Sequence, residues 1–189
     1  MNGQTHVKIA LATALGVGFT EPSALSLVSA ETYEMIPLLA GAVIGGLIPD
    51  IDIKSTLGKY FPITNKIVTG LADKGVRAFY HRHLTHSLLF FPLMLFLALR
   101  YIPLSTNNTV FLFGMLLGVL SHIIADIIIG KVWFLYPIIT KPVSILNVGG
   151  KEHPDRYEKV DRFFGNTAYL ACVIMVVLRW LINNNLITI

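Results

Sequence analysis

The sequence predicts an all-α protein, a polytopic bundle of transmembrane helices. Of its 189 residues, 54% are hydrophobic and 14% are charged, whereas soluble domains carry about 25% charged residues. The mean hydropathy of +0.66 also indicates a chain with too little polar surface to face water on all sides. An apolar segment in lipid satisfies its own backbone by forming a helix. Five such segments are visible, at about residues 7–19, 35–49, 84–102, 110–129 and 167–182.

The lengths of these segments predict about four to five membrane helices in a single domain covering residues 1–189. About 20 helical residues cross a hydrocarbon core of ~30 Å, and the segments 84–102 and 110–129 come close to that length. The segments 7–19 and 35–49 are shorter, since the longer of the two reaches only about 22 Å at ~1.5 Å per residue. These two either use flanking residues or insert part of the way.

The composition also excludes several classes of protein. It is too apolar for a disordered chain or an ordinary cytosolic enzyme, and too poor in cysteine for a disulfide scaffold. The 15 basic and 11 acidic residues give a net charge of +4, too small and too dispersed to indicate nucleic-acid binding. The single cysteine, Cys172, lies in an apolar run, so we expect a packed thiol without a redox role.

The connecting segments differ in charge, and this difference predicts the orientation. Residues 20–34 contain acidic side chains and no Lys or Arg, whereas 50–83 and 130–166 are both rich in basic residues. Because basic loops stay in the cytoplasm, we place 50–83 and 130–166 inside, with interfacial helices in both. The N-terminus is then cytoplasmic. A competing interpretation treats the first apolar segment as a signal peptide, although its flanks fit that pattern only loosely.

Ionisable side chains collect at the cytoplasmic ends of the predicted helices. Such groups are expensive near lipid, so their positions are informative. The orientation was derived from the basic loops alone, and it nevertheless places all of these groups on one side of the membrane. They are His6, Asp50, Asp52, His81, His86, His122 and Asp126.

Helical spacing gives a second indication that these groups meet. His122 and Asp126 are four residues apart and therefore share one face of a helix. Small residues continue the stripe behind each polar group, and small residues let helix backbones approach closely. The third segment does not follow this pattern, because the residues at the same spacing after His86 are the large Phe90 and Met94. The small residues are Gly118 and Gly114 behind His122, Gly46 and Ala42 behind Asp50, and Ala10, Ala14 and Gly18 after His6.

Imidazoles and carboxylates without thiols suit zinc, manganese or a related divalent ion. A metal-activated water could then attack a phosphoester, with Arg82 binding the phosphate. A single histidine at a membrane interface is usually structural, but that interpretation explains poorly why so many polar groups lie at one depth. The remaining charged run is expected to be the solvated face of an interfacial helix. Its members are Asp155, Glu158, Lys159, Asp161 and Arg162.

The order and spacing of four motifs resemble the YdjM-type family of membrane-bound predicted metal-dependent hydrolases, over about residues 5–137. That family is similar to a superfamily of zinc-dependent phospholipases C and single-strand nucleases. The resemblance implies a zinc-type cluster that hydrolyses a phosphoester, with His6, Asp50, Asp52, His81, His86, His122 and Asp126 as ligands. The chain departs from the family pattern at His83, Ile53-Lys54 and Ile129. The matching motifs are Thr5-His6, Gly46–Asp52, His81–Ser87 and Ser121-His122 with Asp126.

We therefore expect a multi-pass inner-membrane protein, in contact with membrane lipids, that carries a metal centre at its cytoplasmic side. The expected core ligands are His6, His86, His122 and Asp126. Asp50 or Asp52 joins them, and the other of these two carboxylates acts as the general base. Two rival functions use the same residues differently: an ion or metal transporter would use the cluster as an ion path, and a membrane interaction protein would use only the helix-packing stripes. The sequence leaves the oligomeric state open.

Overall fold

The computed structural model describes residues 1–20, 35–52, 62–75, 84–101, 103, 105–148, 154–184 and 186. Its long elements there are all α-helices, which confirms the all-α part of the prediction. The described residues contain one isolated β-bridge, between Val132 and Val143. Two short 3-10 turns, η1 and η3, interrupt the helices. The elements are α1 (Gly3–Thr20), α2 (Met35–Leu47), η1 (Ile48–Asp52), α4 (Pro62–Asp73), η3 (Leu84–His86), α5 (Phe90–Tyr101), α6 (Thr106–Ile129) and α7 (Pro154–Asn183).

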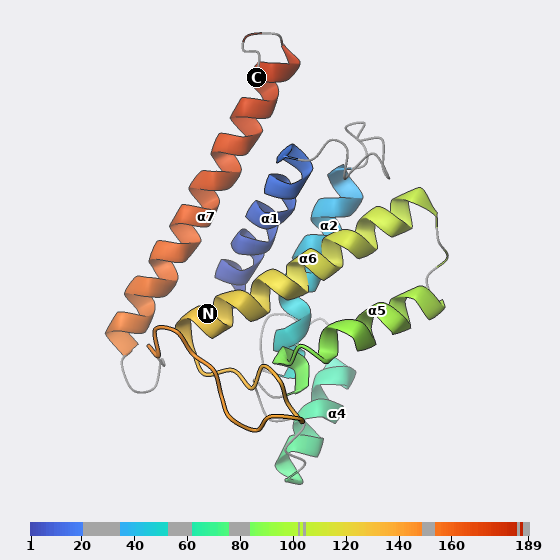
Figure 1. The fold of residues 1–189 in the computed structure, drawn as a ribbon, viewed down its shortest axis with the longest axis vertical. Helices are drawn as coiled ribbons and strands as arrows, with labels where there is room; N and C mark the ends of the chain where they lie inside the picture. Colours follow the sequence, from blue (N-terminus) through green and yellow to red (C-terminus); the bar gives the residue numbers. More distant parts are fainter. Residues whose placement is uncertain are drawn as a thin grey trace.

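Three helices, α1, α2 and α6, form the centre of the bundle (Figure 1). Helix α2 packs along α6 over its length, and α1 packs against both. The long helix α7 lies at the outer side and packs mainly on α1, with few contacts to α6. Helices α4 and α5 lie on the opposite side of α6 from α7 (Figure 1).

The α2–α6 contact depends on glycine. A Cβ atom at Gly114 would lie 2.1 Å from the carbonyl oxygen of Leu38, and one at Gly118 would lie 2.2 Å from that of Ala42. Both distances are well below van der Waals contact, so the two backbones touch where these side chains are missing. Ala10 of α1 is also fully buried, against Gly46. The predicted small-residue stripes are therefore the surfaces along which these three helices pack.

Local sequence explains where α2 and α6 end. Pro49 lacks an N–H group and its ring clashes with the preceding turn, so α2 stops at Leu47 and the chain tightens into η1. Helix α6 ends at Ile129, and its last carbonyls accept hydrogen bonds from the segment that follows. The N–H groups of Ile145, Leu146 and Val148 donate to Ile127, Ile128 and Ile129 at 2.8–2.9 Å. This folds residues 130–148 back beneath the end of α6.

Two helices of the described chain are long and apolar enough to cross a membrane, namely Asn107–Ile129 and Pro154–Ile182. The predicted third crossing, at 84–102, contains a helix of only 12 residues, α5. At ~1.5 Å per residue this helix extends about 18 Å, which is too short to span. The difference arises because the 3-10 turn η3 and the bend after it occupy the first part of the segment.

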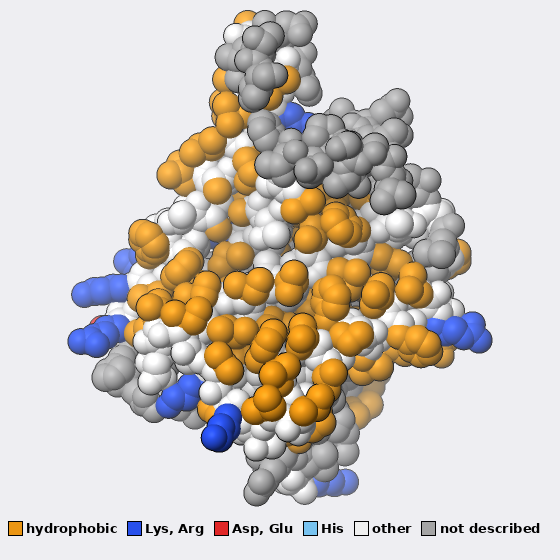
Figure 2. All heavy atoms as spheres, in the orientation of Figure 1, with side chains coloured by type: hydrophobic (Ala, Val, Ile, Leu, Met, Phe, Trp, Pro, Cys, Tyr) orange, Lys and Arg blue, Asp and Glu red, His pale blue; other side chains and the backbone are white. Residues whose placement is uncertain are grey.

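Helix α7 is longer than its apolar part predicted. It begins at Pro154, inside the region 130–166 that was expected to be a loop with its own interfacial helix. Its charged turns and its apolar turns therefore form one continuous helix. The apolar turns expose large side chains such as Val173, Val176 and Trp180. Figure 2 shows hydrophobic side chains spread across the middle of this face of the molecule, with Lys and Arg side chains mainly toward its edges.

The loop 50–83 contains α4, so the expectation of a helix there is confirmed. The rest of the predicted connections, at 21–34, 53–61, 76–83 and 149–153, lies outside the described residues.

Candidate metal centre

His122 is held in place by the end of α2. Its Nδ1 lies 2.7 Å from the carbonyl oxygen of Gly46, which is near the C-terminus of α2, where carbonyls lack partners within the helix. A carbonyl can only accept, so Nδ1 carries the proton and donates. The other ring nitrogen, Nε2, is then the atom that can bind a metal. The close approach of α2 and α6 at their glycines makes this hydrogen bond possible.

His86 is oriented in a similar way by its neighbour in the η3 turn. Its Nδ1 lies 3.0 Å from the hydroxyl oxygen of Thr85. The turn itself is anchored because the N–H of Leu88 donates to the carbonyl of Phe134 at 2.7 Å. His86 is fully buried, and its Nε2 lies 3.2 Å from Nε2 of His122. The two imidazoles therefore present the same type of atom to one point.

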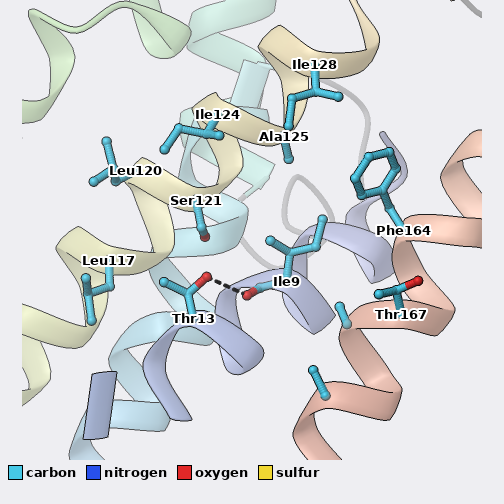
Figure 3. Close-up of a pocket in the computed structure, with 12 residues that line it drawn as sticks. Ile9, Thr13, Leu117, Leu120, Ser121, Ile124, Ala125, Ile128, Phe164 and Thr167 are labelled. Atoms are coloured by element: carbon cyan, nitrogen blue, oxygen red, sulfur yellow. Dashed lines mark hydrogen bonds between the residues drawn. The ribbon is translucent and has the colours of Figure 1, made fainter. Parts of the chain in front are cut away.

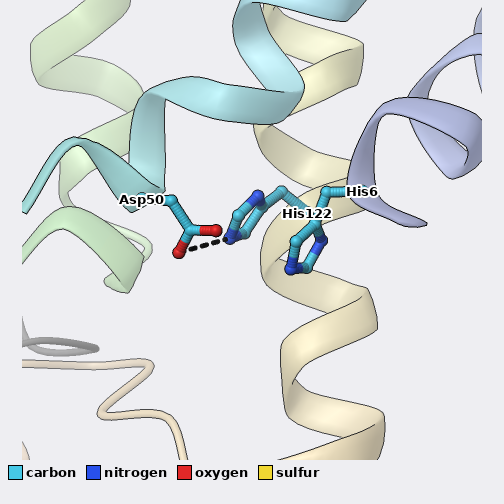
Figure 4. Close-up of side chains that lie close together, drawn as sticks. All are labelled: His6, Asp50 and His122. Carbon is cyan, nitrogen blue, oxygen red and sulfur yellow. Dashed lines mark ion pairs between the residues drawn. The ribbon is translucent and has the colours of Figure 1, made fainter. Parts of the chain in front are cut away.

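Asp50, at the η1 turn after α2, faces this pair of imidazoles. Its Oδ1 lies 3.6 Å from Nε2 of His86 and 3.6 Å from Nε2 of His122. Figure 4 shows Asp50 approaching the ring of His122 from one side and His6 from the other. The rings of His6 and His122 are stacked, with centroids 3.5 Å apart and planes 12° from parallel.

Asp126 lies one turn beyond His122 on α6 and completes the cluster. Its Oδ2 lies 3.3 Å from Nε2 of His86, and its Oδ1 lies 3.3 Å from Nε2 of His6. The amino group of Met1 is also 2.8 Å from Oδ1. Neither ring nitrogen of His6 makes an aligned hydrogen bond within the described residues, although the side chain is fully buried.

These distances suit a metal ion. Zinc bonds to nitrogen and oxygen of about 2.0–2.2 Å in a tetrahedron place the ligand atoms about 3.2–3.6 Å apart. Two groups of three have all their potential ligand atoms within 4.8 Å of one another. Both contain His122, which offers only Nε2, so the two groups are alternative ligand sets around one position. The groups are His6, Asp50 and His122, and His86, His122 and Asp126.

The electrostatics of the cluster also favour a cation. Burial lowers the pKa of His86, but contacts with the carboxylates of Asp126 and Asp50 raise it more, so the pKa of His86 rises to about 9 from 6.5. Two carboxylates buried away from water require positive charge nearby. A divalent cation bound by the same atoms would meet this requirement.

The structure thus brings together five of the seven predicted ligands. His6, Asp50, His86, His122 and Asp126 come from four elements, α1, η1, η3 and α6, and all are buried. His81 and Arg82 lie outside the described residues, as does the side chain of Asp52.

Sequence reasoning missed one residue that supports the site, Asp161 of α7. It was expected in a solvated face but is only 5% exposed. Its Oδ1 accepts from the backbone N–H of Asn2 at 3.0 Å, and its Oδ2 accepts from the hydroxyl of Thr5 at 3.2 Å. An anion at a helix N-terminus is favourable, and this one fixes the start of α1 beside His6. Asp161 lies three residues after Glu158 and directly before Arg162. Those two neighbours pair on the surface, which made Asp161 look like part of the same solvated face.

Comparison with known proteins indicates the same family as the sequence motifs. A family model described as YdjM inner membrane protein matches residues 1–185. The chain belongs to that family. It is also 31% identical over 127 residues to the uncharacterized protein YvsG of Bacillus subtilis. That alignment covers 67% of this chain and 66% of YvsG. No solved structure matches.

Proposed function

We propose that this chain is a metal-dependent hydrolase of the inner membrane that cleaves a phosphoester at the cytoplasmic interface. The observation that carries the proposal is the meeting of three imidazoles and two carboxylates at distances of 3.2–3.9 Å. A cluster held together only for stability would not need five ionisable groups in an apolar bundle, because each costs free energy to bury.

The residues divide into ligands and a base. His86, His122 and Asp126 surround one position, with His6 stacked beside them. A bound divalent ion would activate a water molecule and offset the charge of a phosphate. Asp50, 3.6 Å from both Nε2 atoms, is placed to accept a proton from that water, or to act as a further ligand while Asp52 takes the proton. Arg82, a basic residue of the loop 50–83, is the proposed partner of the phosphate.

Zinc is the metal that the donor set favours, with manganese as the alternative, since nitrogen and carboxylate oxygen ligands suit both. The test is to purify the protein in detergent, measure its metal content, and assay hydrolysis of bis(p-nitrophenyl) phosphate with added zinc or manganese. We expect bound metal and hydrolysis, and the loss of both in His122→Ala. The matched control is Asp155→Asn, an exposed carboxylate at the start of α7, which should change neither.

The burial of the cluster also favours a second function, movement of ions. Groups buried at 0–4% exposure between helices are typical of ion paths in membrane proteins. A transporter would carry zinc or manganese across a sealed liposome, and a hydrolase would not. Bound metal with ion flux and no hydrolysis would replace the first proposal with this one. Folded protein that binds no metal would leave only a packing role.

A further inference from the structure

An apolar groove lies between α1, α6 and α7, on a different face of α6 from the metal centre. It has a volume of about 340 Å³ and arises because α7 packs on α1 but makes few contacts with α6. Figure 3 shows side chains of the three helices pointing into it. The lining residues used in the argument are Ile9 and Thr13 of α1, Leu117, Ser121 and Ile128 of α6, and Ala168 of α7.

The walls of this groove offer almost nothing to a polar ligand. The hydroxyl of Thr13 donates to the carbonyl of Ile9 at 2.9 Å, and the hydroxyl of Ser121 donates to the carbonyl of Gly118 at 2.9 Å. Both groups are thus satisfied by their own helices, and the third hydroxyl of the lining belongs to Thr167, an exposed residue of α7. An occupant that needs no hydrogen bonds, such as a hydrocarbon chain, matches these walls.

The dimensions of the groove fit one acyl chain. Its α6 wall extends from Leu117 to Ile128, which is about 16 Å at ~1.5 Å per residue. That length is close to half of a hydrocarbon core of ~30 Å, or one leaflet.

The groove lies close in sequence to the metal centre, because its lining residues Ile9 and Ala125 come three residues after His6 and one before Asp126, although no residue of the cluster lines it. His6 precedes Thr13 by seven residues, two helical turns, so both lie on the same face of α1. His6 is therefore at the end of the α1 wall, and its ring nitrogens make no aligned hydrogen bond within the described residues. At the same end, the first turns of α7 carry the exposed basic side chains of Lys159 and Arg162, just before the groove residue Phe164. Arg162 pairs there with Glu158, so the exposed Lys159 is the basic side chain that would attract an anionic headgroup.

We propose that the α1–α6–α7 groove holds the acyl chain of a phospholipid-type substrate whose phosphate end reaches the metal centre at His6. This inference rests on the proposed hydrolase function and names its substrate class. The bilayer delivers such a substrate laterally, so the chain enters the groove from lipid between α6 and α7.

The test uses the full-length protein in detergent with a small molar excess of phosphatidylglycerol that carries a diazirine midway along one acyl chain. Photolysis attaches the lipid where the chain lies, and mass spectrometry locates the adducts. We expect them on Ile9–Thr13 and on residues 117–128. Ala168→Phe should fill the groove and lower the yield about tenfold, the equivalent of ~1.4 kcal/mol. Val176→Phe, an exposed position on the same helix, should leave the yield unchanged.

Three results would overturn the inference: adducts spread evenly over the outer face of α7, a yield that Ala168→Phe does not alter, or crosslinks that join two protein copies through the groove. Ala171→Phe provides a second groove variant at a half-buried position if Ala168→Phe fails to fold. Metal content is measured on the same samples. Bound metal without groove adducts would refute the acyl site alone, whereas groove adducts on folded protein without metal would refute the hydrolase and with it the substrate assignment.

Discussion

At the scale of single residues, the centre depends on groups that orient the ligands as much as on the ligands. The carbonyl of Gly46 fixes His122, the hydroxyl of Thr85 contacts Nδ1 of His86, and Asp161 holds the start of α1 near His6. Removing such supporting contacts in metal sites typically costs 10–100-fold in affinity. Substitutions that remove these contacts can therefore test the supporting groups while the clustered His and Asp side chains stay unchanged.

Asp161→Asn should weaken metal binding by about tenfold. The amide keeps the size of the side chain but loses the charge that faces the N-terminus of α1, so His6 is held less firmly. A competition titration with a chromogenic chelator measures the affinity. Glu158→Gln, on the same helix with a 69% exposed side chain, is the control and should bind metal like the parent chain. Equal affinity in the two variants would show that Asp161 does not support the site.

Thr85→Val should also weaken metal binding by about tenfold. Valine keeps the branched shape but cannot contact Nδ1 of His86, now 3.0 Å from the hydroxyl oxygen, so the ring loses the contact that sets its orientation. The same titration applies. Thr85→Ser retains the hydroxyl and should retain the affinity. If the valine and serine variants bind metal equally, the hydroxyl has no role in orienting the ring.

The meeting of the clustered His and Asp residues was predictable from the sequence, whereas the supporting role of Asp161 was not. His122 and Asp126 share a helix face by spacing, and charge asymmetry places His6, Asp50 and His86 at the same depth. Asp161 could not be found in this way. Its neighbours in the sequence are charged and solvated, and its partner Thr5 is 156 residues away, so only the packing of α7 on α1 reveals its role.

At the scale of elements, the site exists because helices approach to backbone contact. The glycines of α6 allow α2 to come close enough for Gly46 to reach His122. The sequence predicted this surface, since small residues at a spacing of four form a stripe on one helix face. It did not predict where α5 and α7 begin, because hydropathy detects apolar length. Hydropathy does not detect the turn before α5, which makes that helix begin at Phe90. It also does not detect the charged turns with which α7 begins at Pro154.

Gly118→Ala should destabilise the protein by about 1–3 kcal/mol, the usual cost of overpacking a tight contact. The new methyl group would lie 2.2 Å from the carbonyl oxygen of Ala42 and would force α2 away from α6. Thermal unfolding in detergent provides the measurement. Gly16→Ala is the matched control, because its methyl group would meet only Met175 Sδ, at 3.8 Å. A stability loss of the same size in both variants would contradict the proposed role of close packing.

At the scale of the whole molecule, the proposed metal centre must lie at one membrane surface. The described structure has two helices that can cross a bilayer, and the family is one of inner membrane proteins. The ionisable cluster lies near the C-terminal end of α6 and at the N-terminus of α1, so both ends must be on the same side. The basic loops predict that this side is the cytoplasm.

The orientation can be tested in whole cells with a membrane-impermeant maleimide. In a Cys172→Ser background, Asn184→Cys, after the end of α7, should be labelled directly, because the predicted orientation places the C-terminus outside. Glu158→Cys, in the charged first turns of α7, should be labelled only after the cells are permeabilised. The opposite pattern would place the metal centre outside the cell and would invalidate the cytoplasmic assignment.

The most direct test of the central claim is X-ray absorption at the zinc edge on protein purified from zinc-supplemented cells. We expect about one zinc per chain, nitrogen and oxygen neighbours at about 2.0–2.2 Å, and outer scattering from imidazole rings that is lost in His122→Ala. Zinc bound by sulfur, or folded protein without zinc or manganese, would contradict the claim that these histidines and aspartates form a metal centre.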